Sequence, residues 1–187
     1  MSAIGLYEQG AVPMNRRNII NIFATMVLGL VLLPASVDAQ QKTLKEQLVG
    51  VWTLVSFDAF DSSGTKVPNI EGDDLKGLLI FTDAGRMSVQ IIAEIPKLAS
   101  NDRLKTTPTE EKAVAHAVLS YFGTYAVSEP DKTISYLIER STFPNQVTGA
   151  EAKRAVTLTG DELKLDNPGR TAGGRTVIVW RRAKAAQ

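Results

Sequence analysis

The sequence predicts an all-β protein, a small antiparallel barrel of about eight or nine short strands with one inserted helix. Two observations carry this prediction. Short apolar segments, several of them alternating with period 2, recur along the chain between turn signals, and strand–helix–strand units do not repeat. A long antiparallel sheet around a single core tends to close into a barrel, because closure removes its unpaired edges.

The composition allows one globular core and excludes several kinds of partner and site. The chain has 187 residues, 44% of them hydrophobic, which is enough for a single domain. Its 21 basic and 20 acidic residues give a formal net charge of +1, so no basic surface for nucleic acid is expected. The absence of cysteine excludes disulfides, thiolate metal ligands, a cysteine nucleophile and a lipidated cysteine.

Residues 1–39 are predicted to be a cleaved export signal. Arg16-Arg17 precedes the apolar run Ile19–Leu33, and Val37-Asp38-Ala39 has the small residues of a cleavage site. The apolar run is shorter than the ~20 residues that span a bilayer, so no membrane anchor is expected after cleavage. The predicted location is periplasmic or secreted, with Met14 as an alternative start and with the general and twin-arginine routes both open. The rest is divided into a lead-in, one barrel domain and a tail, over residues 40–46, 47–183 and 184–187.

The barrel domain is expected to open with a strand and to continue as hairpins. The first strand, Val51–Ala59, alternates strictly, which places Trp52 and Phe57 on opposite faces. Gly160-Asp161 is a hairpin turn, and Pro68 limits the second segment to a short edge strand. The other strands are predicted at Lys66–Ile70, Lys76–Thr82, Arg86–Ala93, Gly123–Ser128, Thr133–Ser141, Lys153–Thr159, Glu162–Leu165 and Arg175–Arg182.

One helix is predicted between these strands, over Thr107–Phe122. Thr107 and Glu110 have the spacing of a capping box, Pro108 takes the first helical position, and Gly123 is expected to end the helix. Side chains three and four residues apart share one helical face. The stripe expected to be buried consists of Val114, Ala117, Val118 and Tyr121.

The middle strands carry polar side chains that suggest a pocket. Tyr125, Tyr136 and Arg140 fall on strands that are expected to be neighbours. Inward polar groups need a hydrogen bond or a ligand, because burial without a partner costs ~1–3 kcal/mol. A self-satisfied internal network or a solvated outer face is the other interpretation, since period 2 does not say which face is inside. The predicted ligand-binding residues are Met87, Val89, Tyr125, Tyr136, Arg140, Phe143, Asn145 and Arg154.

The ordered segments resemble a known family. The segment LVGVWTLVSF, residues 48–57, is similar to the Gly-x-Trp start of lipocalins. About residues 47–183 resemble the bacterial and fungal lipocalin-like domain family. The other segments that carry the resemblance are KGLLIFTDAGRMSVQI, TPTEEKAVAHAVLSYFGTY, ISYLIERSTFPNQVTGAEAKR and GGRTVIVWRR.

The resemblance implies a lipocalin-like barrel with a cavity that binds a small molecule. It also implies that Trp52 packs at the closed end of the barrel, where Arg181 or Arg182 stacks over it in a cation–π contact. Two features depart from classical lipocalins. The predicted helix lies at mid-sequence rather than after the last barrel strand, and the chain has no disulfide. The resemblance implies no particular ligand.

Three functions remain open at this stage. The leading prediction is an exported, non-enzymatic barrel that binds a small hydrophobic or amphipathic ligand without a cofactor or metal. The alternative is a cofactor-free isomerase or cyclase for a polyketide-like or lipid-like substrate, in which Tyr125 or Tyr136 works with Glu139 or Arg154. The third is an envelope protein whose barrel is filled. His116, the only histidine, is expected at the surface or rim, and the oligomeric state is left open.

Overall fold

The computed structural model describes residues 42–169 and 173–184. The chain divides into two units, Met1–Gln40 and Gln41–Gln187, and the described residues all belong to the second. The predicted signal peptide, the alternative start and all but the first residue of the predicted tail lie outside the described residues. Within them, no helix has both the length and the apolar character needed to cross a membrane.

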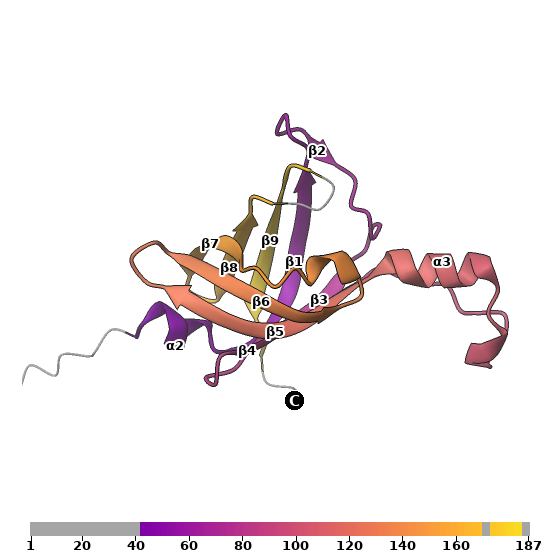
Figure 1. Cartoon of the computed structure of the whole chain (residues 1–187), viewed down its shortest axis with the longest axis horizontal. Helices are drawn as coiled ribbons and strands as arrows, with labels where there is room; N and C mark the ends of the chain where they lie inside the picture. Colours follow the sequence, from indigo (N-terminus) through magenta and orange to yellow (C-terminus); the bar gives the residue numbers. More distant parts are fainter. Residues whose placement is uncertain (1–41, 170–172, 185–187) are drawn as a thin grey trace, which may run out of the picture. The chain divides into compact units, whose positions relative to one another are not determined.

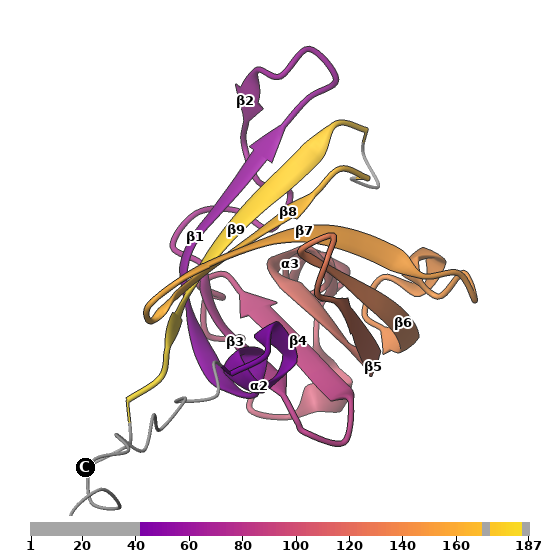
Figure 2. The same ribbon diagram turned by 90° about the vertical axis from the view of Figure 1, so that its left-hand side faces the viewer.

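Within residues 42–169 and 173–184, nine antiparallel strands form one sheet, which closes on itself as a barrel (Figure 2). Closure comes from β1 and β9, which pair from Trp52 opposite Arg182 to Phe60 opposite Arg175. The short β2 pairs only with the far end of β1, so the other eight strands make the barrel and the predicted fold class is confirmed. The strands are β1 (Gly50–Phe60), β2 (Lys66–Val67), β3 (Lys76–Phe81), β4 (Arg86–Ile92), β5 (Val118–Ser128), β6 (Thr133–Ser141), β7 (Ala152–Thr159), β8 (Glu162–Asn167) and β9 (Arg175–Arg182).

The helix α3 is shorter than predicted. It spans Pro108–Ala117 with the predicted Thr107–Glu110 capping box, but the chain then continues directly as β5. Residues 118–122 are strand because they pair with β4 on one side, and from Tyr121 onward also with β6 on the other. Gly123 therefore lies within a strand and does not end the helix. Of the predicted helical stripe only Ala117 is a buried helical residue, whereas Val114 is 36% exposed.

One end of the barrel is closed by the short helix α2 (Leu44–Leu48). Leu44 and Leu48 pack into the core, and the Glu129 carboxylate accepts hydrogen bonds from the first backbone amides of the helix. Trp52 is fully buried beside them, and its indole N–H donates to the Leu48 carbonyl at 2.8 Å. Figure 1 shows α2 and α3 at opposite ends of the barrel.

The last strand completes this closed end. The Arg182 guanidinium lies 4.2 Å from the centroid of the Trp52 ring, and it donates hydrogen bonds to the carbonyl oxygens of Gln47 and Val49. Of the two arginines that the resemblance allowed, Arg182 makes the contact with Trp52. Arg181 is exposed on the outer face. A cation held over a desolvated ring and two carbonyl oxygens joins the first and last strands here.

A β-bulge in β1 changes which side chains face the interior. The pairing with β9 shifts between Leu54 and Ser56, so Val55 is an extra residue without a partner. Val55 is 48% exposed, and Phe57 faces the interior together with Trp52. The prediction that Trp52 and Phe57 lie on opposite faces is therefore wrong.

A second bulge has the same effect in β6. Phe122 of β5 pairs with Arg140 and the next residue, Gly123, pairs with Ile138, so Glu139 is the extra residue. Ile138 faces the interior, whereas Arg140 lies beside the exposed Phe122 on the outer face. Each bulge inverts the alternation of the residues that follow it along its strand.

Candidate functional site

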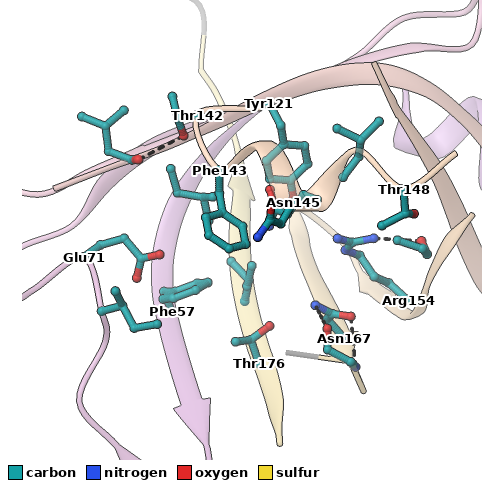
Figure 3. Close-up of a pocket in the computed structure, with 18 of the residues that line it drawn as sticks. Phe57, Glu71, Tyr121, Thr142, Phe143, Asn145, Thr148, Arg154, Asn167 and Thr176 are labelled. Carbon is teal, nitrogen blue, oxygen red and sulfur yellow. Dashed lines mark hydrogen bonds between the residues drawn. The ribbon is translucent and has the colours of Figure 1, made fainter. Parts of the chain in front are cut away.

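A cavity of about 660 Å³, whose lining side chains are drawn in Figure 3, opens at the end of the barrel away from Trp52. On β9, Thr176 and Ile178 line this cavity, whereas Arg182 at the other end of the same strand covers Trp52. The volume falls within the ~300–1,000 Å³ that is usual for small-molecule sites. It contradicts the interpretation of a filled barrel.

Aromatic side chains from separate elements form much of the apolar wall. Phe57 reaches the cavity because of the β1 bulge, and Phe143 comes from the loop after β6 (Figure 3). That loop is held by hydrogen bonds from the Phe143 amide to the Ser141 hydroxyl at 3.0 Å and from the Thr142 hydroxyl to the Val118 carbonyl at 3.1 Å. The loop thereby places Phe143 and the helical turn η2 (Pro144–Gln146) at the mouth.

Among the described residues that line the cavity, Arg154 is the one buried cation. It projects inward from β7 and is only 6% exposed, and one of its nitrogens, Nη1, donates to the Ala152 carbonyl at 2.8 Å. Among the described residues no carboxylate forms an ion pair with it, although Glu71 and Glu151 also border the cavity. A guanidinium has five N–H donors, and only one of them is bonded to a described residue, although the side chain lines the cavity.

The face of the Tyr136 ring supports this arginine. The Arg154 guanidinium carbon lies 4.2 Å from the ring centroid, in a cation–π contact. Tyr136 is 1% exposed and belongs to a layer of aromatic rings that fills the barrel below the cavity. Arg154 thus forms part of the cavity floor, between the aromatic layer and the open space.

The sequence was compared with family models, and one of them matches almost the whole barrel. A sequence model of the family described as "Lipocalin-like domain" matches residues 49–183. This chain belongs to the lipocalin-like domain family. No curated protein matches the sequence of this lipocalin-like protein.

Two solved structures are similar to this lipocalin-like chain. They are crystal structures of the fluorescent protein UnaG, of the wild type and of a single-residue mutant, each 16% identical in sequence. The wild type has a TM-score of 0.35 and covers 74% of this chain and 98% of its own. The mutant has a TM-score of 0.36 and covers 75% and 99%.

The lipocalin-like barrel brings three of the eight predicted ligand-binding residues to the cavity, namely Phe143, Asn145 and Arg154. Arg140 does not reach it, because the β6 bulge turns that side chain outward. The other four predicted residues are inward but lie in the packed core below the cavity. They are Met87, Val89, Tyr125 and Tyr136.

Several lining residues of the lipocalin-like barrel were missed by the sequence analysis. Phe57 was assigned to the wrong face because the alternation hides the bulge, and Tyr121 was assigned to the helix. Thr176 and Ile178 could have been predicted, since they lie four and two residues from Trp180 and therefore share its face of β9. His116 lines the mouth from the last turn of α3, in agreement with the rim position that was expected.

Glu139 does not form the acid–base pair with Tyr125 or Tyr136 that was considered for the enzyme alternative. This side chain lies on the outer face, where Arg86 Nη2 donates to its Oε2 at 3.0 Å. The hydrogen bonds from Arg86 hold the pKa of the Glu139 carboxyl below its usual value. An exposed carboxylate paired with an arginine is not placed to take a proton inside the cavity.

Two tyrosines of the aromatic layer have different surroundings. The Tyr125 hydroxyl donates to the Thr82 carbonyl at 2.7 Å, whereas the Tyr136 hydroxyl has no hydrogen-bond partner among the described residues. Burial raises the pKa of both phenols, and that of Tyr136 lies far above its usual value. Both hydroxyls are therefore protonated donors at neutral pH.

We expect opposite stability changes when these two hydroxyls are removed. Tyr136→Phe should raise the free energy of unfolding by about 1 kcal/mol, because it removes a buried polar group without a partner. Tyr125→Phe should lower it by about 1 kcal/mol, because the hydrogen bond from the hydroxyl to the Thr82 carbonyl is lost. Urea denaturation of both variants measures this, and a change of the same sign in both would contradict the difference in surroundings.

Proposed function

We propose that this lipocalin-like protein is exported and binds one small hydrophobic or amphipathic molecule in its cavity. The observation that carries the proposal is the open cavity of about 660 Å³ at the end of the barrel away from Trp52. A cavity of this size would give a ligand a large apolar contact area, worth roughly 25 cal/mol per Å² removed from water.

The lining has the composition expected of a site for such a ligand. Its apolar part would hold the body of the ligand, and its polar groups would orient it. The apolar side chains include Phe57, Leu119, Ile138, Phe143 and Ile178. The polar side chains include Asn145, Gln146, Thr148, Arg154 and Asn167.

Export is supported by the first 39 residues. An arginine pair, an apolar run and a small-x-small site follow one another in the order of a cleavable signal. The mature protein would then begin at Gln40 and act in the periplasm or outside the cell.

Native mass spectrometry of the protein purified from its own host tests both parts. We expect a chain that begins at Gln40 and that carries one reproducible small molecule, released when the protein is denatured. A chain that keeps residues 1–39 would contradict export. If no small molecule is bound and a panel of lipids gives no mass shift, the binding proposal fails.

A pair of variants on β7 tests whether the molecule occupies this cavity. Ala152 lines the cavity and Ala155 is exposed on the outer face of the same strand. Ala152→Trp should abolish the bound mass because the indole fills the space, whereas Ala155→Trp should keep it. Equal retention by both folded variants would place the bound molecule elsewhere.

A further inference from the structure

We propose that the ligand carries a carboxylate and that Arg154 binds this carboxylate at the floor of the cavity. This inference rests on the proposed function and specifies its ligand as an anionic amphiphile. The charged group would lie inside the barrel, and the apolar body would extend past Phe57 and Phe143 toward the mouth.

Arg154 is buried, although it carries a charge. As a residue Arg154 is only 6% exposed, and the loss of hydration that such burial brings to a charged group is normally compensated by an anion and several hydrogen bonds. Among the described residues Arg154 has one hydrogen bond, to a backbone carbonyl of its own strand, and one aromatic face beneath it. No described carboxylate is paired with it.

The cost of burying this cation is borne when the protein folds, whether or not a ligand is present. An anion that enters the cavity therefore gains a charge-assisted hydrogen bond without a further cost for dehydrating the arginine. The other basic side chain in the lining, His116, lies at the rim on α3. A single buried charge matches a monoanion, and the planar guanidinium matches the two oxygens of a carboxylate.

The acidic residues near the cavity also favour a ligand whose carboxylate points toward the floor. Glu151 is exposed and Glu71 lies in the segment after β2, so both carboxylates border the outer part of the cavity. They would repel a carboxylate left at the mouth and favour one that reaches the floor. Tyr136 acts as a positioning residue, because its ring supports the face of the guanidinium.

The test compares two ligands of equal chain length, decanoic acid and decanol, which differ only in the head group. Displacement of an uncharged fluorescent probe, N-phenylnaphthylamine, from the folded protein gives both dissociation constants. We expect the wild type to bind the acid about 10- to 100-fold more tightly than the alcohol at neutral pH. In Arg154→Met this preference should disappear while the affinity for decanol is retained.

Arg140→Met is the matched control. It removes one arginine charge in the same way, but Arg140 lies on the outer face of β6. This variant should keep the full preference for the acid. Equal losses in the two variants would mean that net charge, and not Arg154, selects the ligand.

The pH dependence of the wild type supplies a measurement that needs no variant. Arginine keeps its charge, so affinity for the acid should fall as the pH decreases through the pKa of the ligand's carboxyl, about 4.3 for a comparable group. Affinity for decanol should not change over this range.

The outcomes separate the two proposals. If decanol and the probe bind but the acid binds no more tightly, the carboxylate inference is wrong and the proposed binding function stands. If the probe and both ligands fail to bind, the proposed function itself is contradicted.

Discussion

Replacing Trp52 with alanine is expected to lower the free energy of unfolding by about 3–5 kcal/mol. The side chain is fully buried at the closed end, where it contacts Leu48 of α2 and Arg182 of the last strand. Its loss would create a cavity, leave the Leu48 carbonyl without its 2.8 Å hydrogen bond and remove the ring beneath Arg182. The three effects act at the place where the first and last strands close the barrel.

Urea denaturation measures this change, because the midpoint and the slope together give the free energy of unfolding. Trp180 offers a matched control, since it is also buried but its indole N–H has no hydrogen-bond partner among the described residues. Trp52→Phe should therefore destabilise more than Trp180→Phe. Unchanged stability in Trp52→Ala would mean that this residue does not hold the closed end.

Replacing Gly123 with alanine is expected to destabilise the protein by about 3 kcal/mol, at the upper end of the range for overpacking. A Cβ atom at this position would lie 2.0 Å from the carbonyl oxygen of Leu137 in the next strand. Because the clash is with backbone, no side-chain rotation relieves it, and β5 would have to move away from β6. Gly123 is also the residue at which the β5–β6 register shifts.

The control for this variant is Gly169→Ala, which makes the same chemical change where a Cβ atom would meet no atom of the described residues within 4 Å. We expect a change within about 0.5 kcal/mol, as for most surface substitutions. Both variants are measured by urea denaturation without added ligand. A Gly123→Ala protein as stable as the control would show that the two strands separate at little cost.

Local patterns in the sequence were sufficient for most of the fold. The bounds of β6 and β9 are those predicted, Thr133–Ser141 and Arg175–Arg182, because alternation and turn residues act within a single segment. The start of α3 was likewise predicted from the sequence, since the capping box at Thr107 is a local interaction. Residues 118–122 were assigned to the helix because Val118 and Tyr121 continue a helical stripe as well as a strand. Pairing with neighbouring strands decided between the two.

The residues of the candidate site were harder to predict from the sequence because of the two bulges. A bulge exists only between two strands, because it depends on which residue lies opposite. Neither Val55 nor Glu139 differs in kind from its neighbours, yet each inverts the facing that follows it. Phe57 therefore lines the cavity and Arg140 does not.

By itself, the sequence determined the number and order of the strands, the hairpins, the capped start of α3 and the pairing of Trp52 with an arginine of the last strand. All of these follow from local periodicity or from a family pattern. The tertiary structure alone decided where the core ends and the cavity begins. Arg154 is a buried cation only because barrel closure surrounds it, and no segment contains that information by itself.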